Sequence, residues 1–70
     1  MKKQKFKIKG EYIELNKLLK ATGICAMGSD AKYLISNNDV KLNGQTELRL
    51  RAKIRIGDIV LVMNNEITIE

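Results

Sequence analysis

Residues 40–63 read VKLNGQTELRLRAKIRIGDIVLVM, and this stretch decides the β-sheet half of the fold. Its first residues, Val40 to Leu42, alternate in the manner of a strand, and the Asn43-Gly44 pair after them is typical of a tight hairpin turn. Its last residues, 59–63, form a continuous apolar run, which is typical of a central strand. The stretch therefore predicts a hairpin and a central strand, joined by a segment of different character.

The joining segment, LRLRAKIRIGD at residues 48–58, alternates apolar residues with cations. Successive side chains of an extended chain point to opposite faces, so the pattern predicts a strand with one face in the core and four cations on the other: Arg49, Arg51, Lys53 and Arg55. Cations two residues apart on a strand lie about 6.5 Å apart, so their row can follow a phosphate backbone. The alternative interpretation is a solvated strand face that keeps the protein soluble. Arg55 ranks below the others because it lies beside the Gly57-Asp58 turn.

The first part of the chain predicts a short strand and a helix. Phe6 and Ile8 alternate with lysines within residues 1–9, which favours a strand with one apolar face. Apolar residues at three- and four-residue spacing predict a helix over residues 12–21, and Thr22-Gly23 supplies the glycine that commonly follows a helix end.

A second helix and a closing hairpin complete the predicted elements. Gly28 or Ser29 caps the helix, Asp30 complements the positive end of its dipole, and residues 37–39 (Asn-Asn-Asp) end it. Residues 64–70 begin with a turn pair, Asn-Asn, and then alternate as a final strand. We therefore predict an α+β fold in which two short helices pack on one side of a small, mostly antiparallel β-sheet.

Composition limits the class of protein further. The 70 residues form one domain, residues 1–70, and carry 13 lysines and arginines against 8 acids, a net charge of +5 that favours polyanionic partners. One cysteine and no histidine exclude an intrachain disulfide and metal sites built on His and Cys, and we expect no cofactor. Cys25 has no histidine base and reads as a small core residue, and the acids form no catalytic pair, so we expect no enzyme.

The sequence also gives expectations about location. No apolar run approaches the roughly 18 residues needed to cross a bilayer, and the lysine-rich start is not followed by the apolar segment of a signal peptide. We expect a cytoplasmic protein that meets neither a membrane nor a small-molecule substrate. A monomer is the default expectation, and the sequence leaves a dimer open.

Four blocks of sequence, in order and at the right spacing, resemble a known family: L-x-x-L-L-x-x-x-G-I from Leu15, G-S-D-A-K-x-L-I from Gly28, V-K-L-N-G from Val40 and R-x-K-I-x-x-G-D-x-V from Arg51. Together they cover about residues 12–63 and closely resemble the S-four RNA-binding domain, named for the fourth protein of the small ribosomal subunit. The pattern looks like the small stand-alone bacterial members. The resemblance implies a fold of two short helices and a small sheet, and an RNA-binding surface made by the start of the second helix and the following hairpin. Relatives that carry this domain bind or act on ribosomal or transfer RNA.

The resemblance turns basic and helix-start residues into candidate RNA contacts. Arg49, Arg51 and Lys53 come first, and Lys32 in the first turn of the second helix comes next. The backbone amides of Gly28 and Ser29 offer a phosphate site, which simple capping explains equally well. The remaining candidates are Lys41 and Asn43 at the hairpin, where turn chemistry is the alternative for Asn43, and Lys17 and Lys20 on the first helix.

One departure from the family pattern concerns the start of the second helix. Many members place Ser-Arg there, whereas this chain has Met27-Gly28 followed by Ser29-Asp30, so an arginine is missing and an acid is present. The five lysines of residues 1–9 are expected to add general positive charge, because mobile chain ends hold few defined contacts.

These observations predict a non-enzymatic protein that docks a structured RNA, ribosomal or transfer RNA, on a basic surface and associates with the ribosome. The prediction requires the cations of residues 49–55 to stand together and outward beside the start of the second helix. One alternative is an adaptor that binds a protein partner through exposed strand edges. Another is a ubiquitin-like sulfur carrier, but such carriers end in Gly-Gly and this chain ends Ile-Thr-Ile-Glu.

Overall fold

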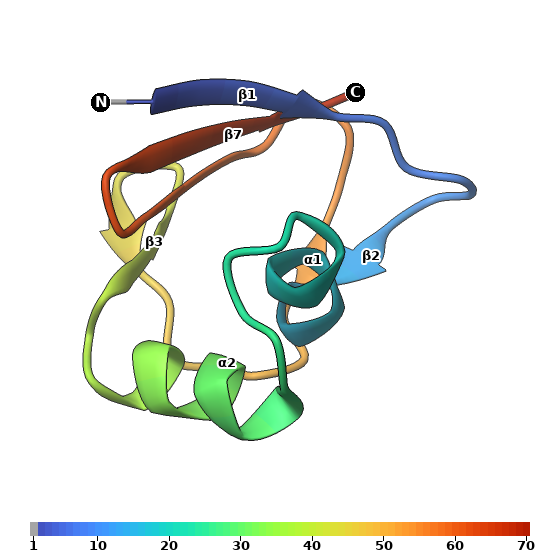
Figure 1. Cartoon of the computed structure of the whole chain (residues 1–70). Coiled ribbons are helices and arrows are strands. Elements are labelled where there is room, and N and C mark those ends of the chain that lie inside the picture. The colour runs from blue at the N-terminus through green and yellow to red at the C-terminus, as the bar shows by residue number, and fades with distance from the viewer. Residues whose placement is uncertain (1) are drawn as a thin grey trace.

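The computed structural model describes residues 2–70 and contains two helices and seven strands in that range (Figure 1). In chain order they are β1 Lys2–Phe6, β2 Ile13–Glu14, α1 Leu15–Ala21, α2 Gly28–Ser36, β3 Val40–Leu42, β4 Gln45–Thr46, β5 Lys53–Ile54, β6 Ile59–Val62 and β7 Asn65–Ile69. Five strands form one sheet in the order β1-β7-β6-β3-β4, and β2 pairs with β5 in a separate two-stranded sheet. All neighbours are antiparallel except β1 and β7. The predicted α+β fold with a mostly antiparallel sheet is confirmed.

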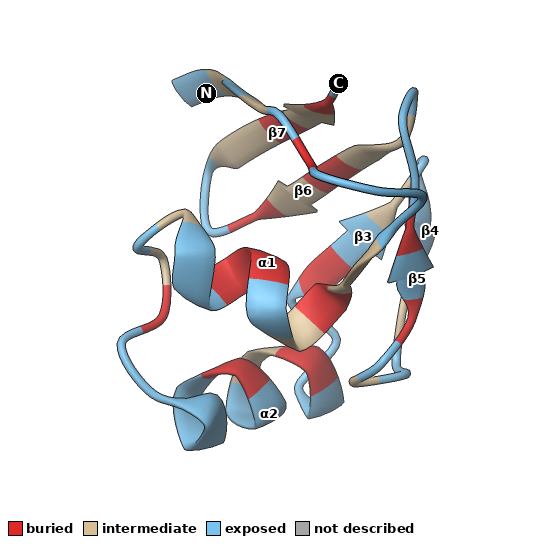
Figure 2. Cartoon of the chain, turned by 90° about the vertical axis from the view of Figure 1, so that its right-hand side faces the viewer, coloured by how far each residue is buried: buried red, intermediate tan, exposed pale blue. Residues whose placement is uncertain are grey.

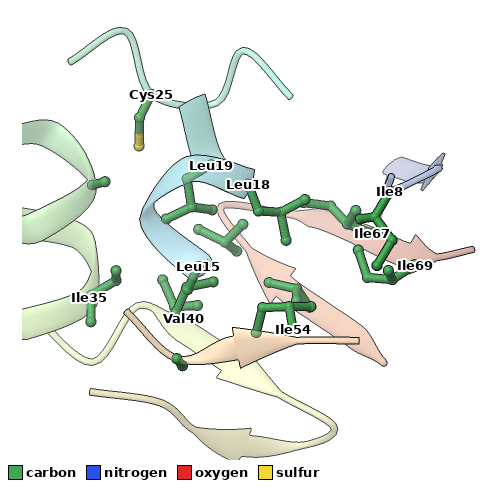
Figure 3. Packing of buried hydrophobic residues seen from close by; sticks show 14 residues of the cluster. Ile8, Leu15, Leu18, Leu19, Cys25, Ile35, Val40, Ile54, Ile67 and Ile69 are labelled. Carbon is green, nitrogen blue, oxygen red and sulfur yellow. The ribbon is translucent and has the colours of Figure 1, made fainter. Parts of the chain in front are cut away.

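The core lies between the two helices and the larger sheet (Figure 3). Leu15, Leu18 and Leu19 of α1 are fully buried, and they meet alternate residues of the strands, because successive strand residues point to opposite faces. The buried strand residues are Val40, Ile54, Val60, Val62, Ile67 and Ile69. Neither helix in residues 2–70 has the length and apolar character needed to cross a bilayer.

Helix α1 begins at Leu15, three residues later than predicted. The two residues before it belong to β2 and pair with β5, so the chain is extended there. The N–H groups of Leu15 and Asn16, which have no partner within the helix, donate to the carbonyls of Ala52 and Leu50 at 2.9 and 3.0 Å. The segment before β5 therefore fixes where α1 starts.

Helix α2 begins at Gly28, but the residue that caps it differs from the prediction. Met27 is the N-cap residue, and its N–H donates to a carboxylate oxygen of Asp30 at 3.3 Å. Gly28 and Ser29 are therefore the first residues of the helix and not its cap. Asp30, three residues after Met27, supplies the side chain that accepts from the Met27 amide. The end of α2 lies at the predicted asparagines, where Asn38 has the positive φ of 64° that often follows a helix.

The Asn43-Gly44 hairpin turn is confirmed, although the second strand of the hairpin is not the predicted one. Asn43 and Gly44 have φ of 52° and 86°, and positive values at both positions mark a type I′ turn. The strand that returns from the turn is the short β4, Gln45–Thr46, and not the basic stretch of residues 48–58.

The basic stretch is a strand at only two residues. The N–H of Ala52 donates to the carbonyl of Arg49 at 3.2 Å, so the chain turns there, and only Lys53–Ile54 pairs with another strand. The turn breaks the regular alternation of faces. Ala52 and Ile54 are buried as predicted, whereas Leu48 and Ile56 at the two ends are 59% and 66% exposed.

The two ends of the chain meet in the larger sheet. The closing hairpin is confirmed, but its turn is Met63-Asn64, one residue earlier than predicted, with both residues at positive φ. The N-terminal strand β1 runs parallel to β7, so residues 2–6 hold defined positions in the sheet (Figure 1). The expectation of a mobile lysine-rich end is therefore wrong for these residues.

Asn43 gives a test of how the hairpin is held. Its side chain donates to Asp58 at 3.0 Å and accepts from the N–H of Ile59 at 2.9 Å. We predict that Asn43→Ala lowers the free energy of unfolding by about 1–3 kcal/mol, since it loses both bonds and strains a positive φ. Asn43→Gly should cost less, because glycine removes the bonds but tolerates this φ. Urea unfolding followed by circular dichroism measures both, and equal losses in the two variants would contradict a role for φ.

Candidate nucleic-acid interface

The cations of the basic stretch gather around one open hollow. Arg49, Arg51, Lys53 and Arg55, together with Ala52, line a depression of about 440 Å³ on the surface. We call this the basic hollow. All four basic side chains are exposed, so the turn at residues 49–52 has not dispersed them. The predicted outward row is thus replaced by cations around a concave surface.

Backbone hydrogen bonds hold the basic hollow at both ends. At one end, the carbonyls of Leu50 and Ala52 accept from the start of α1, and β5 pairs with β2. At the other end, the carboxylate of Asp58 accepts from the N–H of Arg55 at 2.8 Å and from the Asn43 amide at 3.0 Å. The backbone that carries the cations is therefore anchored to α1 and to the β3–β4 hairpin.

One of the four cations is paired with an acid. The guanidinium of Arg49 donates to both carboxylate oxygens of Glu47, at 3.1 and 3.3 Å, and the backbone N–H of Arg49 adds a third bond at 3.0 Å. The only other ion pair in residues 2–70 joins Lys17 to Glu14. Arg51, Lys53 and Arg55 therefore have no acidic partner among the described residues.

Lys53 has an aromatic neighbour instead. Its ammonium nitrogen lies 5.0 Å from the centre of the Tyr12 ring, within the range of a cation–π contact. Tyr12 lies just before β2 and is 41% exposed, and the pairing of β2 with β5 brings the two residues together. The contact places an aromatic ring at the edge of the basic hollow.

The basic hollow does not lie beside the start of α2, where the sequence placed it. The hydrogen bonds of residues 50–54 run to α1 and β2, and Figure 2 shows the first turn of α2 and strand β5 on opposite sides of the view. Gly28, Ser29 and Lys32 are exposed in that first turn, away from the hollow. The carboxylate of Asp30 already complements the positive end of α2 and would repel a phosphate there.

The other sequence candidates are also spread over the molecule. Lys17 pairs with Glu14 at 3.6 Å, and Lys20 is exposed in the last turn of α1. Lys41 is exposed on β3, opposite Leu61 of β6. The side chain of Asn43 is occupied by its bonds to Asp58 and Ile59, which supports its interpretation as a turn residue.

Sequence reasoning ranked Arg55 too low and left Glu47 and Tyr12 out of the candidate site. Arg55 lines the hollow fully, and its place in the alternation was a sufficient signal. Glu47 precedes Arg49 by two residues, and this spacing does not predict a contact from the geometry of a helix or a strand. Tyr12 lies 41 residues before Lys53, and only the pairing of β2 with β5 reveals their proximity.

Cys25 is a core residue, as predicted. Its side chain is buried in the cluster that contains Leu19, and burial raises the pKa of the thiol, with the charge of Asp30 adding to the effect. The thiol is therefore kept in its protonated, unreactive form. Residues 2–70 contain no group of three or more His, Cys, Asp or Glu side chains placed to hold a metal ion.

Comparison with known proteins identifies the class. The S4 domain family model matches residues 6–70, so the chain belongs to the S4 domain family. The solution structure of YbcJ from E. coli is similar: it shares 33% of the sequence, superposes with a TM-score of 0.71, and the match covers 93% of this chain and 84% of that one. That structure was described as revealing a motif, written ALFAL, involved in RNA-binding. No curated protein sequence matches the chain significantly.

The Glu47–Arg49 pair predicts a dependence of stability on pH. The side-chain hydrogen bond from Arg49, above all, lowers the pKa of Glu47 below its ordinary value of 4.5. A carboxylate whose pKa is lowered by folding stabilises the fold at pH values above the ordinary pKa, and this contribution disappears as the pH falls through the lowered value. We therefore expect Glu47→Gln to lower the melting temperature near neutral pH, and the difference from the parent protein to shrink and vanish as the pH falls through the lowered pKa of Glu47.

Glu11→Gln is the matched control, because it removes the same charge from an exposed acid outside the pair. Thermal unfolding followed by circular dichroism, with the pH varied in steps, gives both melting curves. A difference between parent and Glu47→Gln that persists unchanged into acid would contradict the pairing.

Proposed function

We propose that this protein binds RNA and docks the phosphate backbone of a structured RNA on the basic hollow, without catalysing a reaction. The observation that carries the proposal is a group of three cations, Arg51, Lys53 and Arg55, that have no acidic partner within residues 2–70 and line a concave surface of about 440 Å³. Membership of the S4 domain family and the likeness to YbcJ, whose motif is described as involved in RNA-binding, support it.

The chemistry of the hollow suits a phosphate backbone better than base edges. Phosphate oxygens accept hydrogen bonds from guanidinium groups in a bidentate manner, and Arg51 and Arg55 are free to donate in this way. Structured RNA is met largely through phosphates and 2′-hydroxyls, because the deep, narrow major groove of its helices hides the base edges. The proposed interface therefore recognises the shape of the RNA.

The finer proposal is that the bound RNA is ribosomal or transfer RNA, and that the protein acts as a monomer in the cytoplasm in association with the ribosome. Crosslinking in cells followed by sequencing of the attached RNA tests this directly. Enrichment of ribosomal or transfer RNA is the expected result. A scattered distribution over messenger RNAs would reject the finer proposal and leave RNA binding intact.

Electrostatic docking predicts a steep dependence of affinity on salt. Each phosphate contact contributes about −0.7 to −0.9 to the slope of log affinity against log salt. With about three contacts, affinity should fall roughly 20- to 40-fold between 50 and 200 mM salt. Fluorescence anisotropy with a labelled RNA stem-loop measures this slope. A flat response would contradict electrostatic docking on these three cations.

A pair of double variants tests the position of the interface. Arg51→Ala/Arg55→Ala removes two free, exposed cations from the hollow and should make the salt slope shallower by about 1.5, since two phosphate contacts are lost. Lys3→Ala/Lys5→Ala removes the same charge from strand β1, outside the hollow, and should leave the slope nearly unchanged. Circular dichroism confirms that both variants fold. Equal salt slopes in the two variants would contradict the assignment of the interface to the basic hollow.

A further inference from the structure

A second hollow adjoins the basic one, and its lining is of a different kind. Phe6, Ile8 and Ile13 provide apolar and aromatic surface, and Lys7, Lys9 and Tyr12 complete the lining of a depression of about 330 Å³. We call this the aromatic hollow. Its volume lies near the lower end of the roughly 300–1,000 Å³ found for small-ligand sites.

Tyr12 connects the two hollows. Tyr12 lines the aromatic hollow, and the ammonium of Lys53, which lines the basic hollow, lies 5.0 Å from the centre of the Tyr12 ring. The segment that joins β1 to β2 contributes most of the lining of the aromatic hollow, and the pairing of β2 with β5 brings its end beside the basic stretch. A phosphate bound by Lys53 would therefore lie close to Tyr12 of the aromatic hollow.

The charges around the aromatic hollow favour a group attached to a phosphate. Lys7 and Lys9 are exposed and have no acidic partner within residues 2–70. Two acids are near: Glu11 follows in the sequence, and the backbone of Glu70 is hydrogen-bonded to Phe6 and Ile8, but neither acid lines the hollow. An aromatic, partly apolar floor with cations at the rim combines a surface for stacking with positive charge for the adjoining backbone.

We infer that the aromatic hollow holds one unpaired nucleobase of the RNA whose backbone lies on the basic hollow, with Tyr12 as the stacking residue. This inference rests on the proposed function. A paired base is stacked within its helix and cannot enter, whereas the face of an unpaired base is free to stack on an aromatic side chain. The chain thus selects RNA helices interrupted by a single unpaired nucleotide over uninterrupted ones.

Three RNA stem-loops test the inference at one fixed salt concentration: an uninterrupted stem, the same stem with one unpaired adenosine, and that stem with an abasic nucleotide in place of the adenosine. The protein should bind the adenosine-containing stem at least about fivefold more tightly than either of the others, because stacking contributes only there. Equal affinity for the adenosine and abasic stems would overturn the inference, since a bent backbone alone would explain any preference over the uninterrupted stem.

Two substitutions at Tyr12 separate stacking from folding. Tyr12→Leu keeps an apolar side chain but removes the ring, so this variant should lose the preference for the adenosine stem. It should still bind the uninterrupted stem through the basic hollow. Tyr12→Phe keeps the ring and should retain the preference. If the Tyr12→Leu variant also kept the preference, the assignment of stacking to Tyr12 would be overturned.

Tyrosine emission gives a readout that needs no change at Tyr12. The chain has two tyrosines and no tryptophan, so Tyr33→Phe leaves Tyr12 as the single emitter. In this variant the adenosine stem should quench the emission and the abasic stem should not. If all three RNAs bound in a salt-dependent manner but the adenosine and abasic stems quenched equally, the base site would be rejected and the proposed function would stand. If no RNA bound, both the base site and the proposed function would be rejected.

Discussion

The attachment of residues 50–54 to the start of α1 is the constraint on which the rest of the structure depends. The first amides of a helix have no partner within it, and here two of them are satisfied by the carbonyls of Leu50 and Ala52. The pairing of β2 with β5 continues the same contact by two residues. These bonds fix the beginning of α1, and they also hold the arginines and lysines of this segment on the surface beside it.

The charges of this small domain are distributed so that a few cations remain available. The 8 acids could have paired with most of the 13 basic residues, yet among residues 2–70 only Glu47 and Glu14 form ion pairs. Glu47 orients Arg49, whose side chain is still 78% exposed, and leaves Arg51, Lys53 and Arg55 unpaired. These three cations therefore keep their positive charge available to an anionic partner.

The two hollows differ in the chemistry of their linings. The basic hollow offers charge without aromatic surface, and the aromatic hollow offers a ring with charge only at its rim. Tyr12 lines only the aromatic hollow, and its contact with Lys53 at 5.0 Å links that hollow to the basic one. The likeness to YbcJ extends over 93% of this chain, so the fold that joins the two hollows is shared with a solved relative.

The sequence by itself determined the elements whose signals are local. Leucine spacing, the Asn43-Gly44 turn and the apolar run of β6 each act over a few residues, and the α+β class, the hairpin turn and the core followed from them. The cations of residues 49–55 were likewise visible in the alternation. Only the tertiary structure decided that this segment turns and pairs with β2 instead of extending the hairpin, and that it lies beside α1 instead of α2. Those outcomes depend on hydrogen bonds between residues tens of positions apart, which leave no periodic trace in the sequence.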